Sequence, residues 1–330
     1  MSAFVTAIVI GACSSSSTSS VATTATTTVV NNTSTSTTTA ATISFTIAVS
    51  GDTLPHSQLW AGAKRNAALA GNPNGYDFRP MFARVKPLIS RVDLAICHLE
   101  TPIAPVGEPL STYPFFGVPS EITDALADAG YDRCSTASNH TMDRGTAGID
   151  TTLNALDRVG ISQAGMARTP KEIEPKLISV NGISLAHMSY TFSYNGLPAA
   201  SGEGWRSALI DSERILRDVH QAKQIGAQVV IVSLHWGNER ESAPSSFQQQ
   251  IADEITKSGE IDLIVGHHAH VLQPIKKVNG TWADSSRAPP STGASTSGCP
   301  APSWSICSPR SCSRSCRWSV RRSSRPQRSS

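Results

Sequence analysis

Short apolar runs and longer amphipathic stretches alternate along the middle of this 330-residue chain. The apolar runs are rich in β-branched side chains, as is typical of strands buried on both faces; they occupy residues 43–50, 92–98, 228–234 and 261–265, with a weaker run at 131–135. The amphipathic stretches repeat their apolar positions with the period of a helix and occupy residues 80–90, 120–129, 146–159, 212–225 and 247–257. Strands that alternate with helices in this way predict an α/β fold with a largely parallel sheet.

Local signals support several of these boundaries. Ser120 precedes one predicted helix as a candidate N-cap, and glycine closes four of the helices, at Gly130, Gly160, Gly226 and Gly259. The segments 176–180 and 183–189 flank the pair Asn181-Gly182. Asn-Gly between two strand-like runs predicts a β-hairpin closed by a type I′ turn.

The polar residues at the predicted strand ends point to chemistry. In a parallel sheet the carboxyl ends of the strands form one edge, and ligand sites collect outside it. Every such end carries potential ligands here, in the segments Gly51-Asp52, His98-Leu99-Glu100, Ser138-Asn139-His140, His235-Trp236-Gly237 and Gly266-His267-His268-Ala269-His270. Imidazole is the commonest metal ligand, and a mixture of imidazole, carboxylate and asparagine suits Mn, Fe or Zn. We therefore predict one divalent metal site shared by these strand ends.

Within the histidine cluster, His268 and His270 are two residues apart, which puts their side chains on the same side of an extended segment. The other candidates each have an alternative without chemistry. Asp52 may simply shape a turn, His98 and Glu100 may form a solvated edge, and the Asn139-His140 pair may cap a helix. His235 may be a hydrogen-bonded core residue. A shared site accounts for all of them together, so we prefer it.

The composition limits the number of domains and the kinds of cysteine site that the chain can form. With 39% hydrophobic residues, the chain can bury a core in one large or two small domains. The two cysteines of the body, Cys97 and Cys134, predict neither a zinc motif nor a disulfide framework. Cys97 lies in an apolar run, where we expect a small buried hydrophobic side chain.

The N-terminus has the features of a targeting signal. The apolar segment 3–12 is too short to span a bilayer, which needs about 20 residues, and is typical of a secretory signal. Ile10-Gly11-Ala12-Cys13 resembles the lipobox of bacterial lipoproteins, so we expect residues 1–13 to be the signal segment and Cys13 to be lipidated. The Ser/Thr-rich residues 14–42 would then form a disordered tether. No basic residue precedes Lys64, so we expect an upstream start codon; the alternative is an apolar extension without function.

The C-terminal residues 281–330 have a different composition. They hold eight of the 28 basic residues and one of the 25 acidic ones, so the net charge of +3 divides into +7 for this tail and −4 for residues 1–280. The basic pI therefore indicates no nucleic-acid partner for the folded part. Ser, Arg, Pro and Cys dominate, as when GC-rich coding DNA is read out of frame. We predict a frameshift near residue 282, which resequencing tests, and a domain without its last strand.

Two alternatives for this tail remain open. A Ser/Arg-rich segment may bind RNA or an anionic lipid surface, and three cysteines may form a metal site, at Cys307, Cys312 and Cys316.

Residues 43–280 resemble the CapA family of bacterial capsule and poly-γ-glutamate synthesis proteins, which is related to calcineurin-like metallophosphoesterases. The resemblance rests on the following stretches: Gly51-Asp52; Leu99-Glu100-Thr101-Pro102-Ile103; Asn139-His140 with Asp143 and Gly145; Thr152-Leu153 with Leu156 and Gly160-Ile161; His235-Trp236-Gly237 with Glu239, Pro244, Gln248 and Ala252; and residues 259–274. It implies a layered metallophosphoesterase-like fold.

The resemblance also implies roles for individual residues. The metal ligands would be Asp52, Glu100, Asn139, His235, His268 and His270, with His140 as the acid or electrostatic stabiliser near the leaving group. The chain departs from the superfamily in having Leu54 where the first motif carries histidine, with His56 nearby, and in having His98 where relatives carry asparagine. We therefore keep His56, His98 and His267 as possible additional ligands.

Three functions follow as expectations. The first is a surface-anchored CapA-like protein of capsule or poly-γ-glutamate synthesis, export or trimming, with a metal-dependent hydrolase-like site. The second is a secreted phosphoesterase that acts on a cell-envelope substrate. The third is a non-catalytic lipoprotein that binds an anionic polymer.

Overall fold

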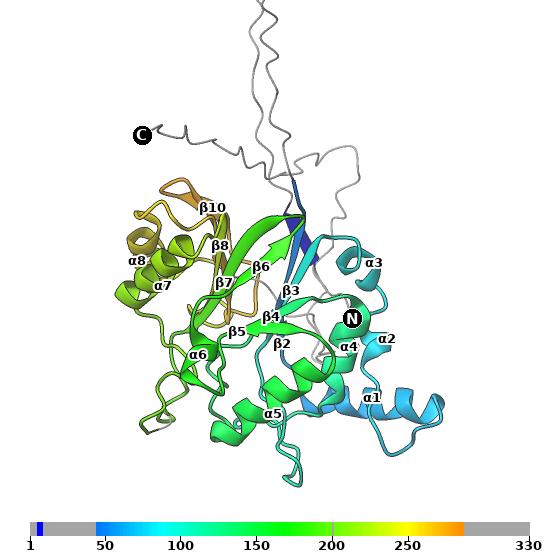
Figure 1. Cartoon of the computed structure of the whole chain (residues 1–330). Coiled ribbons are helices and arrows are strands. Elements are labelled where there is room, and N and C mark those ends of the chain that lie inside the picture. Colours follow the sequence, from blue (N-terminus) through cyan, green and yellow to red (C-terminus); the bar gives the residue numbers. More distant parts are fainter. Residues whose placement is uncertain (1–4, 9–43, 200, 287–330) are drawn as a thin grey trace, which may run out of the picture.

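The structure, a computed structural model of the chain, describes residues 5–8, 44–199 and 201–286 (Figure 1). Two β-sheets form its centre. The first sheet has the strand order β1-β2-β3-β4-β5, with β1 at Val5–Ile8, β2 at Ile47–Thr53, β3 at Leu94–Leu99, β4 at Arg133–Ser135 and β5 at Ser162–Ala164. From β2 to β5 all neighbouring strands are parallel, whereas β1 pairs with β2 in the antiparallel direction.

The second sheet has the strand order β10-β11-β9-β8-β7-β6. Its strands are β6 at Leu177–Val180, β7 at Ile183–Thr191, β8 at Val229–His235, β9 at Leu263–His267, β10 at Ile275–Val278 and β11 at Thr281–Asp284. The four inner strands are parallel, and a hairpin closes each edge. The sequence prediction of a largely parallel α/β fold is therefore confirmed.

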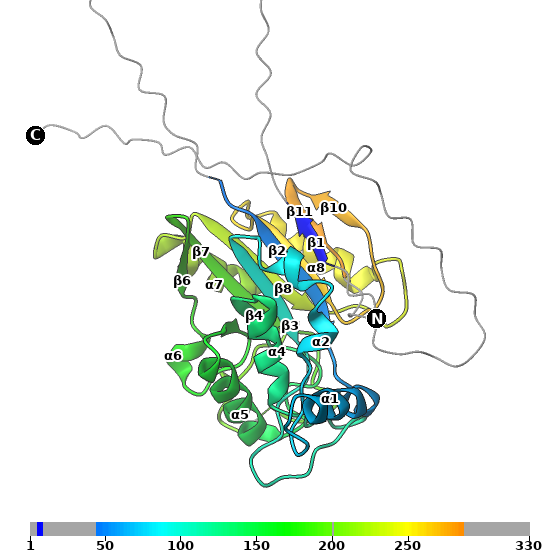
Figure 2. The same ribbon diagram turned by 90° about the vertical axis from the view of Figure 1, so that its right-hand side faces the viewer.

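Helices cover the outer face of each sheet, which produces four layers (Figures 1 and 2). On the side of the first sheet lie α1 at Ser57–Leu69, α2 at Arg79–Phe82, α3 at Lys86–Ile89, α4 at Glu121–Ala129 and α5 at Gly145–Arg158. On the side of the second sheet lie α7 at Ser212–Gln224 and α8 at Ser246–Thr256. The short helix α6, at Pro170–Ile173, precedes β6.

Of the four apolar clusters among the described residues, three include residues of the long strands, and the alternation of side chains along each strand assigns residues to them. On β3, Ile96 packs between the two sheets, while Ala95 and Cys97 pack against the helices of the first sheet. On β8, Ile231 joins the inter-sheet cluster and Val230 packs toward α7 and α8. Because both faces of these strands are buried, their sequences are continuous apolar runs rather than alternating ones.

The described part of the chain confirms most of the predicted elements. The hairpin forms as expected, with Val180 opposite Ile183 and positive φ at both Asn181 and Gly182. The predicted helix at 80–90 is instead two short helices, because Pro87 has no N–H to continue the first of them; it lies in the first turn of α3, where that N–H is not needed. Ser120 makes no side-chain capping bond to α4.

The C-terminal boundary differs from the prediction. The composition of the chain predicted a domain that ends at residue 280 and lacks its last strand, yet β11 pairs with β9 in the parallel direction. The chain stays packed beyond β11, since Ser286 is fully buried and its carbonyl oxygen accepts a hydrogen bond from Gln273. The described domain therefore reaches Ser286, and the edge of β9 is paired rather than exposed. Residues 287–330, the rest of the predicted tail, lie outside the described residues together with Cys307, Cys312 and Cys316.

The cysteines of the body also differ from the prediction. Cys97 is fully buried, as expected, but it forms a disulfide bond with Cys134. The two residues are direct neighbours in the register of β3 and β4 and are 37 positions apart in sequence. Spacing alone gave no sign of this pair, because it arises from strand pairing.

Replacing both cysteines by alanine is expected to lower the free energy of unfolding by about 2–4 kcal/mol, because the cross-link restricts the unfolded chain. Urea unfolding of the double variant, compared with wild type with and without reductant, measures this. Thiol labelling in denaturant provides the control, and two free thiols at Cys97 and Cys134 in unreduced protein would contradict the bond.

Candidate metal centre

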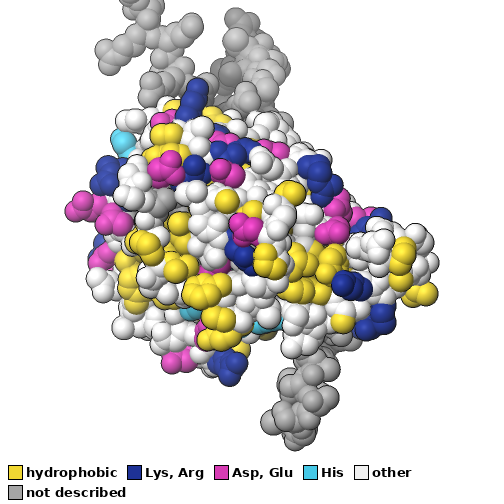
Figure 3. All heavy atoms as spheres, turned by 90° about the horizontal axis from the view of Figure 1, so that it is seen from below, with side chains coloured by type: hydrophobic (Ala, Val, Ile, Leu, Met, Phe, Trp, Pro, Cys, Tyr) yellow, Lys and Arg dark blue, Asp and Glu magenta, His cyan; other side chains and the backbone are white. Residues whose placement is uncertain are grey.

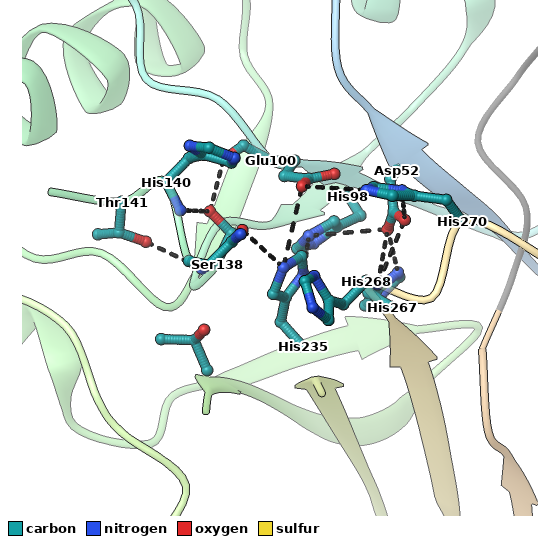
Figure 4. A network of polar contacts seen from close by, with 12 residues as sticks. Asp52, His98, Glu100, Ser138, His140, Thr141, His235, His267, His268 and His270 are labelled. Carbon is teal, nitrogen blue, oxygen red and sulfur yellow. Dashed lines mark hydrogen bonds and ion pairs between the residues drawn. The ribbon is translucent and has the colours of Figure 1, made fainter. Parts of the chain in front are cut away.

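The candidate ligands lie where the apolar core between the two sheets ends. Along β3 the inward positions are Ile96 and then His98, and along β9 they are Val265 and then His267. On β8, two such steps lead from Ile231 past Ser233 to His235. Each strand therefore exchanges an apolar side chain for a histidine at its carboxyl end, and the histidines of one sheet face those of the other (Figure 4).

The strand register aligns these side chains in two rows. In the first sheet Asp52 pairs with His98, and His98 pairs with Ser135. In the second sheet His235 pairs with His267. The strand β2 reaches Asp52 through an irregularity after Val49, so that Asp52 lies inside the strand and not in a turn after it, which was the alternative interpretation.

Asp52 is fully buried and binds the histidine cluster. Its Oδ2 lies 2.9 Å from His270 Nδ1 and accepts a hydrogen bond of 3.2 Å from the backbone N–H of His268, while its Oδ1 lies 3.4 Å from His267 Nδ1. Burial alone would raise the pKa of Asp52, but the contacts with His267 and His270 outweigh burial and hold the pKa well below its usual value. Burial likewise opposes protonation of His270, yet the bond to Asp52 raises its pKa to about 9. Without a cation, these two residues are an ion pair.

Glu100 directly follows β3 and is fully buried. Among the described residues, neither of its carboxylate oxygens has a hydrogen-bond partner. Its Oε1 lies 3.9 Å from His235 Nε2 and 3.9 Å from His270 Nε2, so it stands between two histidines from the second sheet (Figure 4). Burial and the neighbouring Asp52 raise the pKa of Glu100 well above its usual value. A buried carboxylate without donors is costly unless a cation compensates it.

Four sets of potential ligand atoms come within 4.8 Å of one another in the described part of the chain. They are Asp52-Glu100-His270, Glu100-His235-His268, Glu239-His268-His270 and Asp52-His98-His235. Glu100 belongs to the first two sets, which places it between two neighbouring cation positions. Glu239 was not among the predicted ligands; its position two residues after Gly237, just past a strand end, was the available signal.

Asn139 completes the second of these sets. Its Oδ1 lies 2.9 Å from His235 Nε2, and its Nδ2 donates to Asn195 Oδ1 at 3.3 Å. The amide oxygen is thus held toward the same nitrogen of His235 that faces Glu100. The structure therefore brings together all six residues predicted as ligands.

His268 and His270 converge for a different reason from the predicted one. Their φ angles are 89° and 56°, so the segment turns in the left-handed region and is not extended. Burial lowers the pKa of His268 to about 4, with a further contribution from the charge of His270. In the described chain, Nδ1 of His268 has no hydrogen-bond partner although it is buried.

His140 lies beside these ligands and is held by Asp143. Its Nδ1 is 2.6 Å from Asp143 Oδ2, and the same oxygen accepts a hydrogen bond from the backbone N–H of Phe116. The ring of Phe116 packs edge-on against His140, with centroids 4.7 Å apart. These contacts fix the orientation of the imidazole and leave its Nε2 as the nitrogen that can exchange a proton.

The structure places the additional candidate ligands in different parts of the chain. His56 belongs to none of the four sets; its Nδ1 lies 3.1 Å from Thr112 Oγ1, and burial lowers its pKa. His98 and His267 are both at the centre, where their rings stack with centroids 4.0 Å apart. Cys13, the predicted lipidation residue, lies outside the described residues.

The donor set fits a divalent cation. It combines two buried carboxylates, an amide oxygen and several imidazoles, which suits borderline ions such as Mn, Fe or Zn. The unpartnered oxygens of Glu100 supply the independent structural reason for placing positive charge here. Little histidine surface is visible from below, the side on which the carboxyl ends of the strands lie, so the centre is well shielded (Figure 3).

Comparison with known proteins identifies relatives of the chain. It is 32% identical over 164 residues to the PGA biosynthesis protein CapA of Bacillus subtilis, which covers 49% of this chain and 42% of the relative. It is 27% identical over 210 residues to the capsule biosynthesis protein CapA of Bacillus anthracis, with coverages of 61% and 50%. The chain thus spans about half the length of the curated relatives it matches.

Among solved structures, the calcineurin-like phosphoesterase YfkN from Bacillus subtilis aligns with a TM-score of 0.47 and 15% identity, covering 74% of this chain and 82% of that one. Residues 46–284 match the family described as bacterial capsule synthesis protein PGA_cap. This match covers more than half of the chain and agrees with the resemblance found in its motifs. The chain belongs to the family of bacterial capsule synthesis proteins.

Proposed function

We propose that this protein acts in the synthesis, export or trimming of a capsule polymer of the poly-γ-glutamate type, through a metal-dependent hydrolase-like site. The names of the Bacillus relatives support the polymer, and the family match supports the role in capsule synthesis. The observation that carries the site is Glu100, a fully buried carboxylate that accepts no hydrogen bond from the described residues and lies between two groups of candidate ligands.

We assign different roles to the residues of the candidate site. Asp52, Glu100 and His270 would hold one cation, and Glu100, Asn139, His235 and His268 would hold a second. A divalent cation bound there would activate water and polarise a phosphoryl or acyl oxygen. His140, oriented by Asp143, would donate a proton from Nε2 to the leaving group. The buried walls of the centre exclude bulk water from the ligands.

The purified full-length protein is expected to retain Mn, Fe or Zn and to hydrolyse bis(4-nitrophenyl) phosphate. His235→Ala should lose both metal and turnover, because it removes a ligand. His140→Asn should keep the metal and lose turnover by about 10²- to 10⁴-fold, because it removes only the proton donor. Metal content by mass spectrometry and initial rates measure the two properties separately.

His220→Ala is the matched control, since it removes an exposed imidazole of α7 away from the centre. Incubation with poly-γ-glutamate, followed by chain-length analysis, distinguishes polymer trimming from a secreted phosphoesterase acting on another envelope substrate. Metal without any turnover would favour a non-catalytic polymer-binding protein. Absence of bound metal in wild type would contradict the proposed site.

We also propose that the protein is extracytoplasmic and anchored to the membrane through a lipid on Cys13. No helix of the described residues is long and apolar enough to cross a membrane. Cells given a labelled lipid precursor are expected to label wild-type protein and not Cys13→Ala. Equal labelling of the two proteins would contradict the anchor.

A further inference from the structure

A chain of four polar groups runs from the candidate ligand His235 into the first sheet. His235 Nδ1 lies 3.0 Å from His98 Nε2, and His98 Nδ1 lies 2.8 Å from Ser135 Oγ. Ser135 Oγ donates in turn to the backbone oxygen of Cys97 at 3.3 Å. Both imidazoles are fully buried, and burial holds the pKa of each well below its usual value. The 3.0 Å contact between the two ring nitrogens requires one of them to donate and the other to accept, so the two rings share one proton there.

The proton on each ring decides the direction of the whole chain. When His235 carries its proton on Nδ1, it donates to His98; His98 then donates to Ser135, and Ser135 donates to the Cys97 oxygen. The lone pair of His235 Nε2 is then free toward Glu100 and Asn139. In the reverse direction Ser135 donates to His98 and His98 donates to His235. His235 Nε2–H then donates to Asn139 Oδ1, 2.9 Å away.

Both directions contain three hydrogen bonds and the same number of protons. A cation near Glu100 and Asn139 requires the lone pair of His235 Nε2, so it favours only the first direction. Without a cation, the Nε2–H bond to Asn139 favours the second. Reversal moves the proton of each ring from one nitrogen to the other and leaves the total number of protons unchanged. Because a proton cannot cross an imidazole ring directly, one proton is released to water at one end of the chain of bonds and one is taken up from water at the other.

The surroundings of His98 suit this role. Its ring stacks on His267 with an interplanar angle of 11°, which holds the plane of the imidazole. The register places His98 directly beside Ser135, so the strand pairing of β3 and β4 sets the distance between them. His98 Nε2 is at hydrogen-bond distance from His235 Nδ1, and two nitrogens that share a proton cannot both present lone pairs to one ion. This argues against His98 as a ligand, although it belongs to one of the four sets.

We propose that Ser135, His98 and His235 form a hydrogen-bond relay whose direction reverses when a cation binds His235 Nε2, and that His98 is the positioning residue that makes this possible. The reversal rests on the metal site proposed above. The coupling of the two rings does not depend on it, because the relay also exists in the metal-free protein.

The test is ¹⁵N NMR of the histidine rings in the full-length protein, metal-free and with Zn²⁺ alone. Metal-free wild type is expected to carry the His235 proton on Nε2, and the Zn²⁺-loaded protein to carry it on Nδ1. His98→Phe should weaken Zn²⁺ binding by about 10- to 100-fold, the usual effect of removing a residue that orients a ligand. His98→Gln should recover much of this loss, because its side-chain oxygen can accept from Nδ1.

Thermal unfolding of each variant separates misfolding from a positioning effect. An unchanged His235 tautomer on Zn²⁺ addition, or Zn²⁺ affinity of folded His98→Phe equal to wild type, would overturn the relay. If wild type binds no Zn²⁺, the proposed metal function fails. The relay is then judged on metal-free spectra alone: one defined His235 tautomer that becomes a mixture in His98→Phe supports it, and no change overturns it.

Discussion

Replacing Glu100 by glutamine is expected to abolish tight metal binding and to leave the metal-free protein at least as stable as wild type. Glutamine keeps the shape of the side chain and removes the charge that two cation positions share. Removing a residue that only orients a metal ligand usually lowers metal affinity by about 10- to 100-fold. Removing a ligand itself should lower the affinity by at least as much. Metal content and titration with Zn²⁺ measure this.

The stability half of this prediction follows from burial. The oxygens of Glu100 receive no hydrogen bond from the described residues, and the charge of Asp52 lies close by. In the metal-free protein an ionised Glu100 therefore destabilises the fold at neutral pH, so its neutral replacement should not lower the melting temperature. Replacing a residue that serves a cation should leave the melting temperature of the metal-free protein unchanged or raise it, whereas replacing a residue that supports the fold should lower it.

Glu174→Gln is the matched control, because Glu174 is exposed and belongs to none of the ligand sets. It should change neither metal binding nor stability. A metal-free Glu100→Gln protein that melts well below both wild type and the control would show that Glu100 supports the fold rather than a cation.

Replacing Gly266 by alanine is expected to lower the free energy of unfolding by about 3 kcal/mol or more, at the upper end for overpacked cores. A Cβ on Gly266 would overlap the backbone carbonyl group of Ser285. That carbonyl cannot easily move away, because Trp236 Nε1 and Gln248 Nε2 both donate to its oxygen at 2.9 Å. Urea unfolding measures the effect.

Gly204→Ala provides the matched control, since nothing lies within 4 Å of a Cβ at that position. Its free energy of unfolding should stay within about 0.5 kcal/mol of wild type. The comparison also tests the end of the domain. Equal stability of the two variants would mean that residues 281–286 do not pack beside β9, and would restore the boundary at 280 that composition suggested.

The sequence predicted elements with strong periodicity and missed those without it. The long buried strands and the helices α4, α5, α7 and α8 were all found, because burial on one or both faces leaves a regular apolar pattern. Helix α1 was missed because its buried face is formed by Leu59 and two alanines, Ala63 and Ala67, which give a weak signal. The short strands β5, β10 and β11 are too brief to show alternation.

The residues of the candidate site were also predictable only in part. The residue types at the strand ends were sufficient to predict one shared site, since strands of a parallel sheet end at one edge. The resemblance to the family then implied which residues would be ligands: Asp52, Glu100, Asn139, His235, His268 and His270. Their individual partners were not predictable. The bond from His98 to His235 joins two sheets across 137 positions of sequence, and no local pattern contains that distance.

By itself, then, the sequence determined where the long buried strands lie and which strand ends carry candidate ligands, because these depend on periodicity and residue type. Only the tertiary structure decided that Cys97 bonds to Cys134, that β11 covers β9, and that His98 lies behind a ligand. The physical reason is that strand register and the packing of two sheets set these contacts. Both arise only when the chain has folded, so neither produces a periodic pattern in the sequence.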